Sequence, residues 1–164
     1  MPEDEMTDLL PRTVAHSRAE TIHFVLPGST NALGTLFGGT VMQWIDEIAG
    51  VAAVRHAGGI AVTAAVDALQ FLAPIQMGDL VVLKAQVNLA ASTSMEVGVS
   101  VEVEDPRTGV RRKTTRAYLT FVAIDAAGKP RRIPALLASS DEELRRQADA
   151  QRRRAARLAL RGSD

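Results

Sequence analysis

The sequence predicts an α+β fold in which one long helix lies against a strongly curved antiparallel sheet. The helix is indicated by an apolar stretch without proline at residues 40–57. One strand pattern precedes this stretch, and four strand patterns follow it with no further helix between them. Such strands pair as an antiparallel meander, because parallel neighbours need long crossover connections. The chain has 164 residues, enough for one domain with its own core.

The N-terminal residues 1–18 are polar and contain two prolines, so we expect a flexible lead-in. They are also acidic and lack the apolar segment of a signal peptide. The first strand is predicted at residues 20–26, ETIHFVL, and Pro27-Gly28 ends it. The domain itself is expected to span residues 19–137.

The helix at residues 40–57 is apolar on most of its faces, which is typical of a buried helix. It also carries a polar stripe at spacings of three and four, formed by Thr40, Gln43, Asp46, Glu47 and Gly50. An ionised carboxylate in a core is destabilising unless it is paired with a positive group or takes part in binding or catalysis. Two interpretations remain open. Asp46 and Glu47 pair with arginine or cap a neighbouring element, or Asp46 is a general base.

Gly38 and Gly39 lie where this helix begins. Glycine lets a ligand approach the free backbone N–H groups at the positive end of the helix dipole. A carbonyl polarised there would face the carboxylate of Asp46, two turns into the helix. Asn31, in the preceding loop, either makes an Asx turn or directs its amide at a substrate carbonyl or a water.

Four strands are predicted after the helix, at residues 60–72, 80–90, 95–104 and 113–124. The third of them alternates most regularly, with valines on one face and Glu96, Ser100 and Glu102 on the other. This alternation indicates a half-buried strand. The sheet edges would be open in a single chain, so we expect pairing into a dimer.

Residues 138–164 are expected to form an Arg-rich helical tail. Ser140 and Glu143 have the spacing of a capping box, and the acidic first turn suits the helix dipole. Apolar residues are sparse in this segment, which favours a solvated helix. The alternative is a helix that contacts an oligomer partner or an anionic ligand.

Charge and cysteine content exclude several classes of protein. The 19 basic and 19 acidic residues balance, which argues against a general nucleic-acid-binding protein. The chain has no cysteine, which excludes disulfides, cysteine zinc sites and a cysteine nucleophile. The three histidines are too scattered for a metal site, and His56 is expected to be a capping or surface residue. No apolar run is long enough to span a membrane, so we expect a cytoplasmic protein.

Arg111, Arg112, Lys113 and Arg116 place four basic side chains near the start of the last strand. They form either a solvated hairpin end or an anion site. A ligand with several phosphates would suit such a site, because guanidinium groups bind phosphate through two parallel hydrogen bonds.

Four stretches give the sequence a resemblance to a known family: TNALGTLFGGTVMQWIDEIAG, VTAAVDALQFLAPIQMGD, TSMEVGVSVEVEDP and RAYLTFVAIDAAGKPRRIP. Together they cover about residues 20–135. Their order and spacing resemble the hotdog-fold acyl-CoA thioesterases, in the branch of the cytosolic long-chain acyl-CoA hydrolases and their bacterial relatives. The Arg-rich helix also resembles the tail of the eukaryotic members.

This resemblance implies a hotdog fold, in which a curved antiparallel sheet wraps a long central helix. It implies a homodimer with two sites at the interface, often assembled as a trimer of dimers, which is a hexamer. The catalytic aspartate of the family pattern GG-x-x-M-x-x-x-D corresponds to Asp46. The second catalytic residue, an asparagine from the partner subunit, corresponds to Asn31. Eukaryotic members split this pair between two fused domains, whereas this chain keeps both, so both sites of a homodimer are expected to be active.

The resemblance therefore implies hydrolysis of fatty acyl-CoA to a fatty acid and CoA. Asp46 would act as general base on a water or as nucleophile through an anhydride, and the sequence does not choose between them. Near the thioester the predicted substrate-binding residues are Phe37, Gly38, Gly39 and Gln43, the glycine N–H groups stabilising the oxyanion. A tunnel for the acyl chain is predicted beside Met42, Trp44 and Phe71, and CoA is predicted to bind Ser94, Arg112, Lys113 and Arg116.

Two alternatives keep the fold and change the function. The first is a non-enzymatic acyl-CoA sensor, but known regulators of that type carry an added DNA-binding module, for which the short lead-in is not expected to leave room. The second is a hydratase or dehydratase, which generally needs a catalytic histidine on or beside the helix, and no histidine lies between Asn31 and Arg55. A thioester is already activated, so no metal and no cofactor beyond the CoA of the substrate is expected. We expect neither a nucleic acid nor a membrane as a partner.

Overall fold

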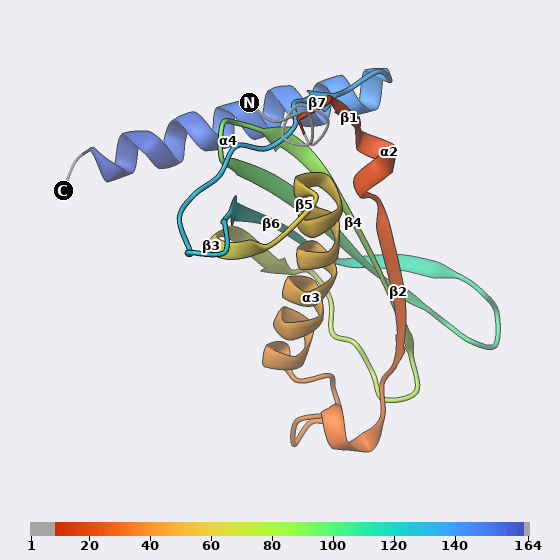
Figure 1. Cartoon of the computed structure of the whole chain (residues 1–164). Coiled ribbons are helices and arrows are strands. Elements are labelled where there is room, and N and C mark those ends of the chain that lie inside the picture. Colours follow the sequence, from red (N-terminus) through yellow and green to blue (C-terminus); the bar gives the residue numbers. More distant parts are fainter. Residues whose placement is uncertain (1–8, 163–164) are drawn as a thin grey trace.

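One helix, α3 (Gly38–Ala57), lies against a five-stranded antiparallel sheet (Figure 1). The computed structural model of the chain describes residues 9–162. The strand order is β2-β4-β5-β6-β3. The strands are β2 (Ala19–Phe24), β3 (Ala61–Phe71), β4 (Leu80–Ala90), β5 (Ser94–Glu104) and β6 (Arg111–Ala123). The predicted α+β arrangement, with its long central helix, is confirmed.

The two faces of the sheet differ because side chains alternate along each strand. The helix face packs on α3 and forms the core; in β5 it carries Met95, Val97, Val99, Val101 and Val103, each at most 2% exposed. The outer face is the opposite one, and in β5 it carries Glu96, Gly98, Ser100 and Glu102. The alternation predicted for this strand is therefore confirmed.

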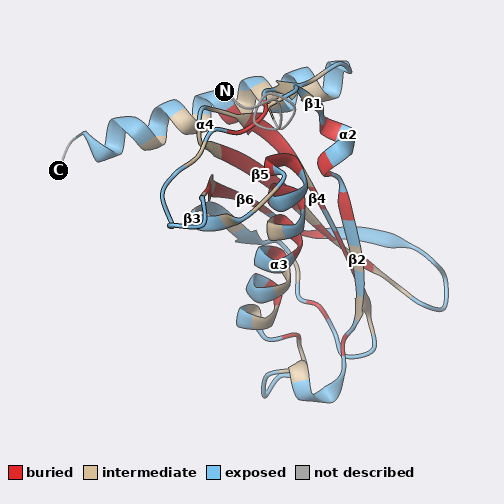
Figure 2. Cartoon of the chain, in the orientation of Figure 1, coloured by how far each residue is buried: buried red, intermediate tan, exposed pale blue. Residues whose placement is uncertain are grey.

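The prediction that α3 is buried on most sides is wrong for the single chain, because the sheet covers only one side of the helix (Figure 2). That side carries the buried residues Val41, Ile45, Ile48, Ala49, Ala52, Ala53, His56 and Ala57. The opposite side is exposed and includes Met42, Asp46, Val51 and Val54. In the single chain Asp46 is thus exposed and is not a carboxylate inside a core.

The C-terminal end of α3 is held by a glycine cap and by an arginine from the N-terminal segment. Gly58 has a φ of 68°, the left-handed conformation that favours glycine at this position. Arg12 Nη1 donates hydrogen bonds to the carbonyls of Arg55 (2.7 Å) and His56 (3.0 Å). His56 is fully buried, with Nε2 3.0 Å from the carbonyl oxygen of Pro134. The prediction of a capping or surface histidine is therefore wrong.

The N-terminal segment is packed rather than loose. The strand β1 (Arg12–Thr13) pairs in parallel with β7 (Leu136–Leu137), and the short helix α2 (Val14–Ser17) follows it with two buried residues. The prediction of a flexible lead-in over residues 1–18 is therefore wrong for residues 12–17, which form β1 and α2. The first eight residues lie outside the described part of the chain.

The last helix, α4 (Asp141–Arg161), crosses one end of the sheet (Figure 1). Its predicted capping box between Ser140 and Glu143 is confirmed. Arg153 binds the buried carboxylate of Glu96 through two hydrogen bonds of 2.7 and 3.0 Å, and its guanidinium lies 3.6 Å from the centre of the Tyr118 ring. These partners lie on the outer face of the sheet, so α4 is not a fully solvated tail.

Candidate active site

Phe37 and the two glycines come together at the start of α3, as predicted. Phe37 is the N-cap, and its carbonyl accepts hydrogen bonds from the amides of Thr40 (3.0 Å) and Val41 (3.3 Å). The amides of Gly38 and Gly39 have no acceptor within the described part of the chain, as is usual for the first residues of a helix. A Cβ on Gly39 would lie 2.7 Å from Cε1 of Phe37, so the phenyl ring rests directly on the glycine backbone. The helix therefore presents two free N–H donors at its positive end.

An apolar pocket of about 350 Å³ adjoins this helix start. Val41, Phe71 and Leu72 contribute to its wall, and Gly38 is part of its lining. Trp44 lies elsewhere, because its ring stacks on His23 of β2, with centroids 4.1 Å apart. Since β2 and β3 are opposite edges of the sheet, the predicted tunnel beside Met42, Trp44 and Phe71 is not formed within one chain.

Asp46 is fixed by a neighbour that the sequence analysis missed. Thr63 Oγ1, from β3, donates a hydrogen bond of 2.7 Å to Asp46 Oδ1. Asp46 Oδ2 accepts no hydrogen bond from any described residue and lies on the open side of α3. The sequence contains one feature that could have pointed to Thr63: it is the one polar residue in the stretch IAVTAAV at residues 60–66. The arrangement orients one carboxylate oxygen and leaves the other free for a water or a substrate.

Gln43 lies one turn before Glu47 on the same open side of the helix. Its Nε2 donates a hydrogen bond of 2.8 Å to Glu47 Oε1. The predicted polar stripe of α3 therefore makes two side-chain hydrogen bonds. One joins Gln43 to Glu47 within the helix, and the other joins Asp46 to Thr63 of β3. Neither carboxylate forms an ion pair with arginine within the described residues.

Asn31 makes the Asx turn that was one of its two interpretations. Its Oδ1 accepts hydrogen bonds from the amides of Leu33 (2.9 Å) and Thr35 (3.2 Å), and its Nδ2 donates to Thr35 Oγ1 (2.8 Å). This loop precedes the helix start, whereas Asp46 lies about 12 Å further along the helix axis at 1.5 Å per residue. One chain therefore does not bring Asn31 and Asp46 together.

The four residues predicted to bind CoA are also dispersed. Arg112 bonds the carbonyl of Pro74 at 3.0 Å and pairs with Asp79 at 3.7 Å. Lys113 and Arg116 lie on the outer face, in register with Glu102 and Ser100. Ser94 begins β5, about 20 Å along the strand from Ser100. These residues do not form one site in a single chain, and their contacts with CoA stay predictions.

The described residues contain no group of three or more His, Cys, Asp or Glu that could hold a metal ion. None of the helices in residues 9–162 is both long enough and apolar enough to cross a membrane.

The chain is similar in sequence to proteins that are named as acyl-CoA thioester hydrolases. The sequence profile described as thioesterase superfamily matches residues 33–110. The uncharacterized acyl-CoA thioester hydrolase YkhA of Bacillus subtilis is 42% identical over 120 residues, which are 73% of this chain and 70% of the relative. The cytosolic acyl coenzyme A thioester hydrolase of Mus musculus is 33% identical over 83% of this chain. The match spans only 36% of that longer relative.

Solved structures resemble the whole described fold. An acyl-CoA hydrolase of Staphylococcus aureus, solved with butyryl coenzyme A and coenzyme A, has a TM-score of 0.88 and 38% identity over 93% of each chain. Three alanine variants of that hydrolase have also been solved, each replacing one asparagine, one aspartate or one threonine. An apo-hexameric acyl-CoA thioesterase has a TM-score of 0.89 and 39% identity, covering 92% of this chain and 97% of the other.

Proposed function

Because the chain belongs to the thioesterase superfamily, we propose that it is an acyl-CoA thioesterase that hydrolyses fatty acyl-CoA to a fatty acid and CoA. The observation that carries this proposal is the pair of Asp46 and Thr63, which leaves one fixed carboxylate with a free oxygen on the open side of α3. The names of the relatives support the same reaction. The cytosolic location is supported by the name of the mouse relative.

The variants solved for the Staphylococcus aureus hydrolase support these residue roles. In that protein the aspartate follows the asparagine by 15 positions, and the threonine follows the aspartate by 17. Asn31, Asp46 and Thr63 have the same two spacings in this chain. We therefore assign Thr63 to the site together with the two residues predicted from the sequence.

In the general-base route, Asp46 Oδ2 takes a proton from a water whose oxygen attacks the thioester carbonyl carbon. Thr63 holds Oδ1, so the other oxygen stays directed at the water. The oxyanion accepts hydrogen bonds from backbone N–H groups, and its collapse breaks the C–S bond. The proton on Asp46 then passes to the departing CoA thiolate. The nucleophilic route through an anhydride remains an alternative with the same products.

The oxyanion donors come from a second copy of the chain in this proposal. Gly38 and Asp46 of one chain are about 12 Å apart along α3, too far to act on one carbonyl group. The open side of α3 exposes Met42, Val51 and Val54, and the edge strand β3 is largely exposed, with free backbone groups for pairing. A homodimer that covers these surfaces would bring the Asn31 loop and helix start of one chain to Asp46 of the other.

Assembly of three such dimers into a hexamer is part of the proposal. It is supported by the hexameric thioesterases among the similar structures. Sedimentation of the purified protein would measure the mass directly. A hexamer would support the proposed assembly, and a stable monomer with full activity would contradict both the assembly and the shared site.

The test of the function is release of free thiol from a panel of short to long acyl-CoAs. Wild type should release CoA, and Asp46→Asn should not, although both fold. Asp141→Asn is the matched control, because it removes an exposed carboxylate from α4 and should retain activity. Binding of acyl-CoA without thiol release by wild type would overturn the hydrolase proposal and favour the sensor.

A further inference from the structure

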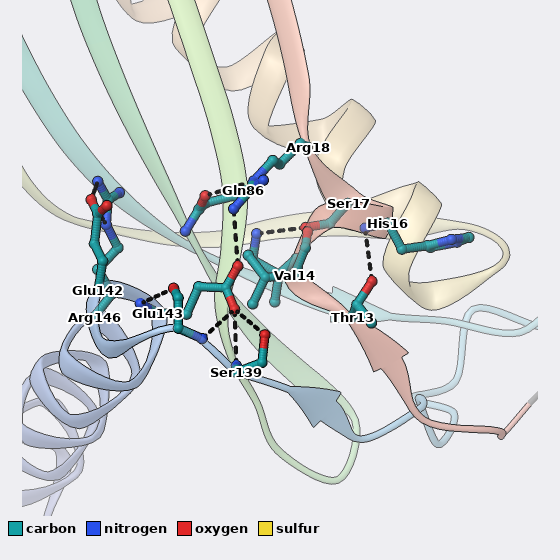
Figure 3. A network of polar contacts seen from close by, with 12 residues as sticks. Thr13, Val14, His16, Ser17, Arg18, Gln86, Ser139, Glu142, Glu143 and Arg146 are labelled. Atoms are coloured by element: carbon teal, nitrogen blue, oxygen red, sulfur yellow. Dashed lines mark hydrogen bonds and ion pairs between the residues drawn. The ribbon is translucent and has the colours of Figure 1, made fainter.

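The start of α4 is fixed on the outer face of the sheet, on the side of β4 (Figure 3). Arg18, just before β2, donates hydrogen bonds to Glu143 of α4 (2.9 Å) and to Gln86 of β4 (3.4 Å). The carboxylate of Glu143 also accepts the amides of Ser139 and Ser140. The first turn of α4 is therefore held in place, and the rest of the helix extends from it across the sheet.

Two arginines mark the path of α4 over the remaining strands. Arg153 pairs with Glu96 of β5 (2.7 Å) and lies over the ring of Tyr118 in β6. Arg157, one turn later, pairs with Asp67 of β3. The strands β5, β6 and β3 are consecutive in the sheet, and β3 is its edge. A helical turn advances about 5.4 Å and neighbouring strands are about 4.8 Å apart, so α4 crosses roughly one strand per turn.

Leu160 continues this line of residues beyond the edge of the sheet. It follows Arg157 by three positions and Arg153 by seven, so all three side chains lie on the side of α4 that faces the sheet. One further turn after Arg157 carries the helix past β3, and Figure 1 shows the end of α4 on the β3 side of the molecule. Within residues 9–162 the sheet has no strand beyond β3 at this edge. Leu160 is accordingly 74% exposed, although it lies on the sheet-facing side of the helix.

The outer face of β3 is an apolar surface that suits a leucine. Ala61 packs against the core on the helix face, so Val62 beside it lies on the outer face, where it is 42% exposed. Ala68 lies on the same outer face, because it is in register with Tyr118. In the homodimer proposed above, the strand next to β3 is β3 of a second copy. That strand presents this apolar face where the last turn of α4 ends.

We propose that the last turn of α4 crosses the subunit boundary and packs, through Leu160, on the outer face of β3 in a second copy of the chain. A twofold dimer makes this contact twice, because each α4 reaches the sheet of the other chain. The contact lies on the face of the sheet opposite α3, so it adds to the interface without contributing a residue to the site at Asp46. The inference rests on the proposed pairing of two chains through β3 and is independent of the proposed reaction.

Photo-cross-linking tests the contact, because the chain has no cysteine and a single one can be introduced at a chosen position. Leu160→Cys is labelled with a benzophenone maleimide and irradiated. Covalent dimers should form, and trypsin digestion should show position 160 joined to residues 56–84, the fragment that contains β3. Ala155→Cys is the matched control. It is also exposed, but it lies two positions from both arginines, points away from the sheet and should not cross-link to that fragment.

A second substitution at the same position measures what the contact contributes to assembly. Leu160→Ser should raise the protein concentration at which half of the oligomer dissociates by at least about tenfold, because a dimer loses two buried leucines. Leu144→Ser makes the same change at an exposed leucine near the start of α4 and should leave that concentration unchanged. Sedimentation over a dilution series measures both variants, and circular dichroism verifies that each is folded.

Cross-links from position 160 to another part of a neighbouring chain would assign Leu160 to a contact between dimers and overturn the inference. Absence of covalent dimers, or equal dissociation of Leu160→Ser and wild type, would also overturn it. A monomeric wild type would overturn it together with the proposed shared site. If wild type releases no thiol but Leu160→Cys cross-links as expected, the hydrolase proposal fails and the contact of α4 with the second copy stands.

Discussion

Thr63 Oγ1 donates a hydrogen bond of 2.7 Å to Asp46 Oδ1, and this bond joins the middle of α3 to the edge strand β3. Thr63 lies beside a β-bulge, where the register of β3 shifts between Thr63 and Ala65. Bulges redirect side chains near functional sites. The orientation of the proposed catalytic carboxylate therefore depends on an irregularity of the neighbouring strand.

Thr63→Val should lower kcat for thiol release by roughly 10- to 100-fold, because Asp46 loses the donor that orients it. The fold should be retained, since the change preserves shape at an exposed position. Thr120→Val is the matched control, because its buried hydroxyl has no partner within the described residues and its loss should not lower activity. Unchanged kcat in Thr63→Val would remove Thr63 from the site.

Mixed oligomers test whether Asn31 acts across the subunit boundary. Asn31→Ala and Asp46→Asn should each be nearly inactive alone. In dimers formed from both variants, one site would combine an intact Asn31 with an intact Asp46, so random mixing should restore about a quarter of wild-type activity. The measurement is thiol release after co-expression with two different tags. Lack of any recovery in verified mixed dimers would indicate that Asn31 acts within its own chain, and full activity of Asn31→Ala alone would remove it from the site.

Acid should destabilise the domain through His56. Burial is the main cause that lowers the pKa of His56 below 6.5; the hydrogen bond to Pro134 opposes it, and the charge of Arg12 adds to it. The unfolded chain then binds more protons than the folded one, so the free energy of unfolding falls as the pH drops below about 6.5. Urea unfolding between pH 5 and pH 8 measures this slope. His56→Gln should flatten it, and an identical slope in that variant would assign the effect to other groups.

Arg153→Ala should lower the free energy of unfolding by roughly 3 kcal/mol, because it leaves the buried carboxylate of Glu96 unpaired. The adjacent Arg152→Ala removes an exposed pair with Asp149 and should cost less than about 1 kcal/mol. Chemical denaturation of both variants makes the comparison. Equal effects of the two substitutions would mean that the contact between α4 and the sheet contributes little to stability.

The five strands and the long helix were predictable because their signals are local. Alternation in β5 and the glycine stop after α3 each depend on neighbouring residues. The side of α3 that stays open was not predictable, since its apolar residues look like core residues in the sequence. Their exposure in one chain supports the proposal that a second copy covers this side of α3.

Contacts between residues far apart in the sequence were also not predicted, because local sequence patterns carry no information about them. Arg153 is 57 positions from Glu96, and Arg157 is 90 positions from its partner Asp67, so nothing in the local pattern of α4 predicted that it packs on the sheet. In the site, the positions of Asn31 and Asp46 followed from the resemblance. Thr63 did not, because its role depends on how β3 lies beside α3.

The attachment of α4 also bears on how the chain folds during synthesis. Glu96 and Asp67 belong to strands that precede α4 in the chain, so they are synthesised before their partners Arg153 and Arg157. Until they emerge, the nascent sheet carries unneutralised carboxylates on its outer face. Closure of that face is then a late, long-range step, as expected for contacts of high sequence separation. Completion of the native structure therefore waits until α4 has been synthesised.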